Sequence, residues 1–279
     1  MSNTDLKPLD PDETRFGFGE NWSEYSAHIE DQHIQNAVSG MSELLSAGDI
    51  KGKTFLDIGS GSGLHSLAAL KKGAKFVTAI DLDPQSVETT RAVLNRFWSE
   101  DNYQTEQASI LEDGDILGAQ YDIVYSWGVL HHTGGMWDAI ARASSAVKDN
   151  GLFVLALYKK TPLCNAWTFE KKIYSSLPKI LRFPIDYIYA LFYCLGLLLT
   201  GKNPVNYIKE YSSKRGMLWM TDVRDWLGGY PYESVSPKEI ERQMNLAGFT
   251  LEKSINDGPA AVKGLFGTGC GEYVFRKKK

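Results

Sequence analysis

Residues 55–63 (FLDIGSGSG) place an apolar run directly before a turn that carries glycine at every second position. A helical pattern begins right after the turn, so this order predicts a buried parallel strand, a tight loop and a helix N-terminus. Glycine suits the loop because a side chain would keep the backbone away from a ligand or forbid a positive φ. A second apolar strand, residues 76–80, ends in Asp81. Ligands of open α/β sheets lie outside the carboxyl ends of parallel strands, so we expect the loop and Asp81 to face one crevice.

The glycine spacing bears on which ligand the crevice holds. A dinucleotide fingerprint needs G-x-G-x-x-G, whereas this loop reads G-x-G-x-G and Leu64 stands where the third Rossmann glycine would be. Asp57, at the strand end, is unfavourable beside a pyrophosphate but can accept hydrogen bonds from an ammonium group. An adenosyl ligand that carries an amino acid therefore fits better, with its ammonium at Asp57, its carboxylate at the helix N-terminus and its ribose hydroxyls at Asp81.

With these features the chain resembles the class I S-adenosylmethionine-dependent methyltransferases over about residues 50–160. Residues 121–132 (YDIVYSWGVLHH) match their fourth strand and the segment beside the cofactor. The pair His131 and His132 follows the fourth strand, as a His-His pair does in small-molecule methyltransferases that are often labelled by similarity to benzoquinol methylases. The chain therefore resembles this branch of the family. The resemblance implies an α/β, Rossmann-like sheet of seven strands, mostly parallel with the last strand antiparallel. It also implies helices on both faces and a mainly helical insertion after the fifth strand.

The cofactor implied is S-adenosyl-L-methionine. The residues expected to bind it lie on the glycine loop, at strand ends and beside the fourth strand: Asp57, Gly59, Ser60, Gly61, Gly63, Asp81, Leu82, Ser109, Ile110, Ser126 and Trp127. Ser109 stands where many family members carry an acid that faces the adenine, so we expect adenine recognition to shift to backbone groups and the Ser109 hydroxyl. The plain alternative is a glycine turn in a parallel sheet with no ligand. No metal is expected, because the three cysteines are far apart and form no C-x-x-C pair.

The chemistry needs a group that can take a proton. A sulfonium makes its methyl carbon electrophilic, so the protein must align a nucleophile with it and remove a proton where one leaves. Histidine, with a pKa near 6.5, suits removal of a hydroxyl proton. The resemblance implicates the pair in some small-molecule O-methyltransferases, so we expect His131 or His132 to be the general base. Alternatively, one of them orders the loop by bonding a backbone carbonyl and the other faces solvent.

Residues 159–235 are the departure from a minimal methyltransferase and are expected to form a substrate lid. Residues 187–199 (YIYALFYCLGLLL) carry no charge. This run is too short for a bilayer span, which takes about 20 apolar residues. It is therefore a buried cap helix, a membrane-surface helix or the wall of an apolar substrate pocket. Residues 214–233, dense in Trp, Tyr, Arg, Asp and Gly, predict a recognition surface carried on loops, with a purely structural lid as the alternative.

Candidate substrate contacts are Tyr158, Arg215, Asp222, Asp225 and Glu233. The three acids could instead orient the imidazole, and each charged residue could simply form an ion pair in the lid. Short basic clusters such as Lys171-Lys172 are expected to be solvated. The aromatic, glycine-laced residues 16–25 are expected either to fold over the cofactor or to staple onto the sheet, before a helix at about 29–45.

Four parts are expected along the chain: a disordered tail at 1–14, an N-terminal segment and cofactor-binding core at 15–158, the lid at 159–235, and a C-terminal helix with closing strands at 236–279. The formal net charge of −4 argues against a nucleic-acid partner. A polar N-terminus and unpaired cysteines favour the cytoplasm.

We therefore expect a cytoplasmic methyltransferase that O-methylates a small-molecule acceptor of apolar, glycan or lipid-linked character. The alternatives are an RNA or protein methyltransferase of the same fold, an NAD-type oxidoreductase, and a non-catalytic cofactor-binding or membrane-associated partner protein. Membrane contact, if any, is expected to be peripheral and to run through residues 187–199. The sequence predicts no oligomeric state.

Overall fold

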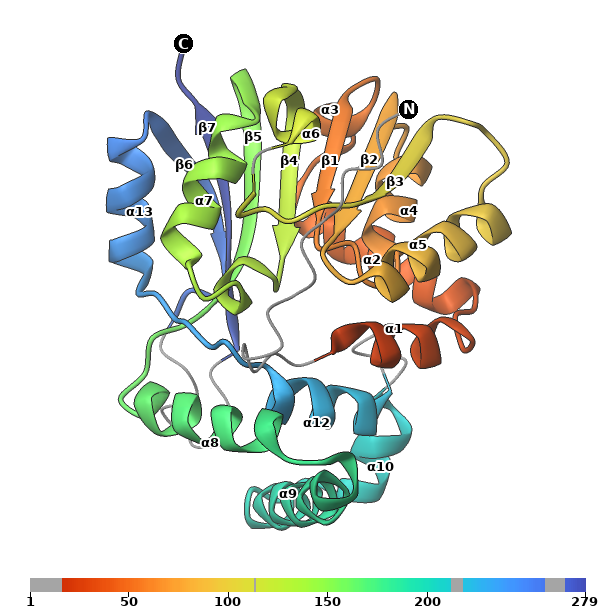
Figure 1. Cartoon of the computed structure of the whole chain (residues 1–279), viewed down its shortest axis with the longest axis vertical. Coiled ribbons are helices and arrows are strands. Elements are labelled where there is room, and N and C mark those ends of the chain that lie inside the picture. The colour runs from red at the N-terminus through yellow and green to blue at the C-terminus, as the bar shows by residue number, and fades with distance from the viewer. Residues whose placement is uncertain (1–16, 113, 212–217, 259–268) are drawn as a thin grey trace.

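A computed structural model describes residues 17–112, 114–211, 218–258 and 269–279. Seven strands form one sheet in the order β3-β2-β1-β4-β5-β7-β6 (Figure 1). Their bounds are β1 Thr54–Ile58, β2 Phe76–Asp81, β3 Tyr103–Gln107, β4 Tyr121–Trp127, β5 Val147–Tyr158, β6 Phe249–Ile255 and β7 Cys270–Lys277. Of the strands in the described ranges, only β7 runs antiparallel to its neighbours, β5 and β6, so the predicted fold class is confirmed. The strand order reverses between β1 and β4, and such a switch point is where ligands of these sheets bind.

Helices cover both faces of the sheet. The helices before β5 are α1 Phe18–Ser26, α2 Asp31–Leu44, α3 Ala47–Ile50, α4 Leu64–Lys71, α5 Pro84–Phe97, α6 Asp115–Gly118, the 3₁₀ turn η1 Leu130–His132 and α7 Met136–Ser145. Those that follow β5 are α8 Cys164–Ser176, α9 Lys179–Leu199, α10 Pro204–Lys209, α12 Trp219–Gly228 and α13 Pro237–Leu246.

Alternation along the strands divides the core into two layers. Phe55 and Val154 pack with α2, α4 and α5 on one face, and their neighbours Leu56 and Phe153 pack with α7 and α13 on the other. All four side chains are fully buried. Successive side chains of a strand point to opposite faces, so near-continuous apolar runs are what a sheet covered on both sides requires.

Helices α5 and α13 begin at side-chain caps, each followed by a proline. The Asp83 side chain accepts a hydrogen bond from the backbone N–H of Gln85 at 2.8 Å, with Pro84 in the first position of α5. Ser236 accepts one from Glu239 N–H at 3.3 Å before Pro237 at the start of α13. Both caps satisfy a backbone donor that the helix itself cannot pair.

Other local expectations were wrong. Residues 214–233 were expected on loops, but within them Trp219–Gly228 form α12. The N-terminal segment holds two helices, α1 and α2, where one was expected.

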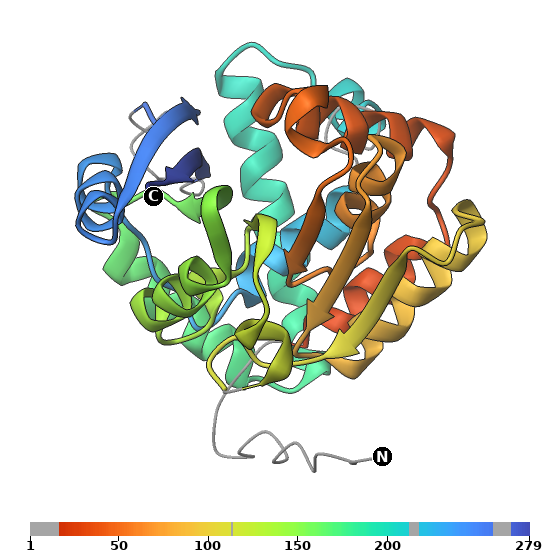
Figure 2. The ribbon, with the colours of Figure 1, turned by 90° about the horizontal axis from the view of Figure 1, so that it is seen from above.

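The lid helices gather at one end of the sheet. Figure 1 shows α1, α8 and α12 beyond the carboxyl ends of the parallel strands, with α9 on their outer side. Viewed from above, the strands lie nearer the viewer and α9 lies below them (Figure 2).

The length argument for residues 187–199 was wrong. They are the second part of α9, a helix of 21 residues that is long and apolar enough to cross a membrane by length and composition. The buried-cap interpretation is also wrong, because only 17% of the apolar window is buried.

Candidate active site

The glycine loop joins the end of β1 to the start of α4. Gly59, Gly61 and Gly63 adopt φ values of +77°, +53° and +77°, a region that side chains disfavour. The N–H groups of Gly59 and Ser60 donate to the carbonyl of Ile80 at 2.8 and 3.0 Å. These bonds hold the loop against the end of β2.

A Cβ would also find no space at two of these positions. At Gly59 it would lie 2.4 Å from the Val129 side chain, and at Gly61 it would lie 3.0 Å from the indole of Trp22. The loop is therefore enclosed by the segment after β4 on one side and by α1 on the other.

Asp57 and Asp81 stand at the ends of β1 and β2. Asp57 is 2% exposed and accepts a hydrogen bond from Ser66 Oγ at 2.6 Å. Burial raises its pKa to about 7, and it joins none of the ion pairs among the described residues. Asp81 accepts from the N–H groups of Gly61 at 3.0 Å and Asp83 at 2.9 Å, and burial raises its pKa to about 6.

This donor set fits an adenosyl amino acid. A buried carboxylate without a nearby cation favours a ligand that brings its own positive charge, which an ammonium group does at Asp57. The carboxylate of such a ligand would meet the N-terminus of α4, where the Gly63 cap leaves backbone N–H groups available. Asp81 is placed for ribose hydroxyls.

The remaining predicted cofactor contacts divide into two groups. Ser60, Leu82, Ser109 and Ile110 lie on the loop and past the ends of β2 and β3, with Ser109 Oγ accepting from Leu111 N–H at 3.2 Å. The second group is Ser126 and Trp127, whose side chains form hydrogen bonds to other strands of the sheet or their ends. Ser126 Oγ donates to the Ile58 carbonyl at 3.2 Å, and Trp127 Nε1 donates to Glu272 at 3.2 Å.

Helix α1 supplies contacts that the residue-level reasoning missed. Its Gly19 N–H donates to Asp83 at 2.9 Å, and Asn21 Nδ2 donates to Asp225 Oδ1 at 2.5 Å. Trp22 faces Gly61. The aromatic residues of 16–25 were the signal for this segment, but nothing in the sequence marks Asn21.

The histidine pair occupies η1, directly after β4. His131 is fully buried, and neither of its ring nitrogens has a hydrogen-bond partner within the described chain. Its ring lies 3.9 Å from that of Tyr158 and 4.3 Å from that of His132, centroid to centroid. His132 Nδ1 lies 2.8 Å from the carbonyl oxygen of Pro231. A carbonyl only accepts, so Nδ1 carries the proton and Nε2 keeps a lone pair.

Burial sets the charge of both rings. It lowers the pKa of His132 to about 4 and that of His131 well below its ordinary value, with the charges of His132 and Lys171 acting in the same direction. Both imidazoles are therefore neutral at neutral pH. A neutral imidazole with a free lone pair can accept a proton.

Lys171, expected to be solvated, is fully buried. Its Nζ lies 3.7 Å from the centre of the Trp226 ring and donates to the carbonyl of the same residue. Burial lowers the pKa of Lys171. Lys171 is buried because α12 packs over α8, and no local sequence pattern indicates this packing.

The candidate substrate residues fall in different places. Tyr158 joins the histidine pair, and Glu233 N–H donates to the His131 carbonyl at 2.9 Å. Glu233 Oε2 accepts from Met136 N–H at 2.9 Å, while Asp222 accepts from Tyr211. With Asp225 bonded to Asn21, the acids show no hydrogen bond to either imidazole among the described contacts. Arg215 lies outside the described residues.

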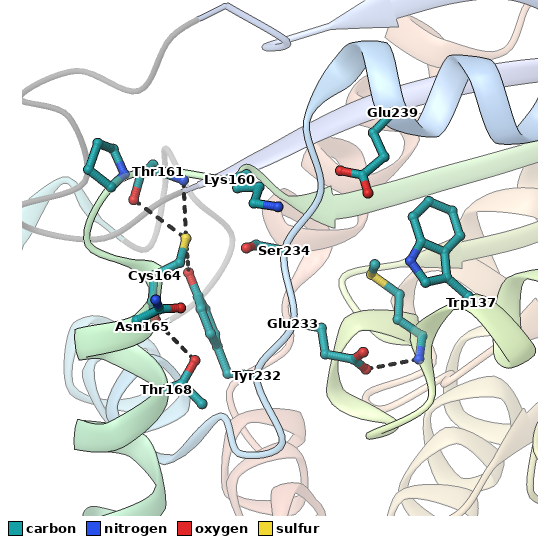
Figure 3. Close-up of a pocket in the computed structure, with 12 residues that line it drawn as sticks. Trp137, Lys160, Thr161, Cys164, Asn165, Thr168, Tyr232, Glu233, Ser234 and Glu239 are labelled. Carbon is teal, nitrogen blue, oxygen red and sulfur yellow. Dashed lines mark hydrogen bonds between the residues drawn. The ribbon is translucent and has the colours of Figure 1, made fainter.

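A cavity of about 510 Å³ lies beside Tyr232 and Glu233 (Figure 3). The ring of Tyr232 lies 5.3 Å from that of Tyr158, and its hydroxyl is 3.5 Å from Cys164 Sγ. The cavity is lined by Met136, Trp137, Lys160, Thr161, Pro162, Cys164, Asn165, Thr168, Tyr232, Glu233, Ser234 and Glu239. Of these, only Glu233 was among the predicted site residues.

The fold is the one that class I S-adenosylmethionine-dependent methyltransferases share, and residues 56–153 match a family model described as a methyltransferase domain. This segment contains the glycine loop, Asp81 and the histidine pair. A ribosomal protein L11 methyltransferase from Tolumonas auensis is 36% identical over 109 residues, which are 39% of this chain and 35% of that protein. The chain thus spans about a third of the length of this relative.

Solved structures are similar in fold. Magnesium protoporphyrin IX methyltransferase from Synechocystis PCC 6803, with bound SAH, aligns with a TM-score of 0.53 and 15% identity over 88% of this chain and 84% of that one. A methyltransferase in complex with the Trm112 methyltransferase activator of Haloferax volcanii aligns with a TM-score of 0.52 and 14% identity, over 96% and 98% of the two chains. At such identities the likeness concerns the fold alone.

Proposed function

We propose that the chain is an S-adenosylmethionine-dependent methyltransferase that methylates a hydroxyl oxygen of a small, largely apolar acceptor. The observation that carries the proposal is Asp57, a buried carboxylate without an ion-pair partner among the described residues. It stands beside the glycine loop within the segment that matches a methyltransferase domain. The three free cysteines support a cytoplasmic location.

In this proposal the chain holds the cofactor through the loop and two carboxylates. Asp57 takes the ammonium, the N-terminus of α4 the carboxylate and Asp81 the ribose hydroxyls, while Leu82, Ser109 and Ile110 line the adenine side. When bound, the cofactor supplies an electrophilic methyl group. Trp22 and the rest of α1 exclude water from the loop.

His132 is the general base in this proposal. Its Nδ1–H is fixed by the Pro231 carbonyl, which leaves Nε2 to accept the hydroxyl proton. The low pKa of His132 keeps it neutral but makes it a weak base, which favours an acidic hydroxyl such as a phenol, with a pKa near 10, over an alkyl alcohol. Tyr158 and His131 form the aromatic wall behind it.

Methyl-labelled cofactor and small-molecule extract from the source organism test the proposal, with mass spectrometry identifying what becomes labelled. We expect His132→Ala to lower turnover by about 10²- to 10⁴-fold and to leave cofactor affinity unchanged. The matched control is His28→Ala, at an exposed position. Full activity in His131→Ala, His132→Ala and the double variant would exclude the pair as base. Failure of the wild type to bind the cofactor would exclude the function itself.

A second candidate is protein methylation, which the match to ribosomal protein L11 methyltransferases favours. The same labelled reaction, supplied with the protein fraction of the extract, distinguishes the two. Label in a polypeptide and none in small molecules would replace the first proposal with the second. Binding without transfer to either fraction would indicate a non-catalytic protein.

A further inference from the structure

Helix α9 exposes a face of large apolar side chains to solvent. Ile180 is 80% exposed, Phe192 62% and Leu199 90%. The same face carries the half-exposed side chains Leu181, Phe183, Tyr187, Ile188, Leu191, Leu195 and Leu198. Soluble proteins rarely leave a contiguous apolar surface of this kind uncovered, and where they do it marks an interaction site.

The opposite face of α9 points into the protein and carries polar groups beside the apolar Ile185 and Ala190. Asp186 is 4% exposed, accepts from the Tyr174 hydroxyl at 2.5 Å and lies 3.4 Å from Arg224 Nε. Two turns later the hydroxyl of Tyr193 lies 3.1 Å from that of Tyr207. A helix on a protein surface normally keeps its polar groups outward, whereas α9 buries a carboxylate and leaves most of its large apolar side chains exposed.

The inward polar face rules against a helix that crosses the bilayer. To span it, α9 would have to leave α12 and carry Asp186 into the hydrocarbon, where a carboxylate is costly. The contacts of Asp186 with α8 and α12 hold α9 flat on the molecule instead (Figure 1). An amphipathic helix that lies in the plane of the membrane surface needs no such separation.

The charged residues around the apolar face of α9 indicate which kind of partner surface would bind there. Asp186 is the only acid in α9, and it is buried. Exposed lysines lie at both ends: Lys179, which pairs with Glu20, and Lys202. Lys172 and Lys209, on the neighbouring helices α8 and α10, are exposed as well. Lysines beside an apolar face suit anionic lipid headgroups, whereas antiparallel pairing of α9 with a second copy would bring Lys179 near Lys202.

We propose that α9 docks on the surface of a bilayer that contains anionic lipids, with its apolar face in the boundary between headgroups and acyl chains. Arg224 of α12 forms an ion pair with Asp186 of α9, and Asp225 of α12 accepts a hydrogen bond from Asn21 of α1. Helix α1 in turn contacts the glycine loop through Trp22. The docked face and the crevice are thus joined through α12. Resting on the proposed function, this places membrane-held hydroxyl compounds within reach of the active site.

Co-sedimentation of the full chain with vesicles tests the docking and needs neither cofactor nor activity. We expect at least tenfold more binding to vesicles of phosphatidylcholine with phosphatidylglycerol than to phosphatidylcholine alone, and weaker binding in high salt. Leu191→Ser with Phe192→Ser should lower binding at least tenfold. Leu199→Ser and Leu246→Ser form a matched pair, since each leucine is exposed and is the last residue of its helix. Only Leu199→Ser should weaken binding.

The variants must keep their melting temperature and their cofactor affinity, which shows that they fold. Equal sedimentation of the wild type and the double variant, or none by the wild type, would overturn the docking. So would resistance of the bound chain to carbonate extraction, which indicates a spanning helix. Dimerisation that the double variant abolishes, without vesicle binding, would assign the face to a second copy. If docking holds but no label is transferred, only the proposed function fails.

Discussion

At the scale of single residues, the space around Gly61 rather than its backbone angle distinguishes it from Gly52, which lies before β1 and outside the glycine loop. Gly52 and Gly61 both adopt a positive φ, +75° and +53°. A Cβ at Gly52 would meet nothing within 4 Å, whereas at Gly61 it would contact the Trp22 indole. Both positions resist a side chain through strain, but only one of them would disturb the candidate site.

This difference yields a prediction for Gly61→Ala, with Gly52→Ala as its control. Each change should cost about 1 to 2 kcal/mol of unfolding free energy, because alanine is strained in the left-handed region. Only Gly61→Ala should displace Trp22 and weaken cofactor binding, by tenfold or more. Isothermal titration and denaturant unfolding measure the two effects. Equal cofactor affinity in both variants would mean that the loop does not hold the ligand.

A second prediction concerns the pH dependence of cofactor binding. Burial raises the pKa of Asp57 to about 7, so below pH 7 the folded chain holds a proton there that an incoming ammonium must displace. Affinity should therefore rise from pH 5.5 to 8 and level off above the pKa, with proton release on binding at pH 6.

Titration in buffers of different ionisation enthalpy measures the released proton. Asp57→Asn should bind more weakly and should lose the pH dependence above about pH 6, leaving only the part due to Asp81, while Glu241→Gln, at an exposed position on α13, should retain it. A profile that is flat in the wild type would contradict the role of Asp57.

At the scale of elements, α1 is the part whose position most affects the crevice. It is tied to α5 through Gly19 and Asp83 and to α12 through Asn21 and Asp225. These two bonds join segments that are far apart in the sequence. The helix therefore depends on both halves of the chain for its place over the glycine loop.

Loss of one tie should loosen α1. Asn21→Ala leaves the partly buried Asp225 carboxylate without this donor, which costs about 1 to 3 kcal/mol, and amide exchange in residues 18–26 should become faster. Glu20→Ala is the control on the same helix, since its pair with Lys179 is exposed and contributes less than about 1 kcal/mol. Exchange rates measured by mass spectrometry decide the matter. Identical rates in both variants would show that α1 is held by other contacts.

Local patterns also explain what the sequence could predict at this scale. The caps at Asp83 and Ser236 depend on a few adjacent residues, so a cap residue followed by proline marks each helix start in the sequence itself. Lys171 and α9 depend on which helices pack together after the chain folds. Lys171 looks solvated and the uncharged run looks buried until the packing of α12 is known, because α12 covers Lys171 and most of the run stays exposed.

At the scale of the whole molecule, the buried histidines make stability sensitive to acid. In His132 the folded-state pKa, about 4, lies below the ordinary value near 6.5. The unfolded chain therefore binds the proton more readily. The stability contributed by the neutral ring is complete above pH 6.5 and is lost as the pH falls towards 4.

His132→Gln should remove this contribution to acid sensitivity. Between pH 7 and 5 the wild type should lose roughly 2 kcal/mol relative to the variant, since each unit below the unfolded-state pKa counts for about 1.4 kcal/mol. Denaturant unfolding at the two pH values provides the measurement. His28→Gln, at an exposed position, should follow the wild type, and a similar response in both variants would contradict the assignment.

The place of β7 between β5 and β6 has a consequence for biosynthesis. Among the strands that the structure describes, β6 pairs only with β7, so it lacks this partner when the ribosome has made it, although β1 to β5 are already complete. Until residues 270–277 emerge, the nascent chain leaves the edge of β5 open to a neighbouring polypeptide. Translation of these residues thus joins β6 to the sheet and closes that edge in a single late event.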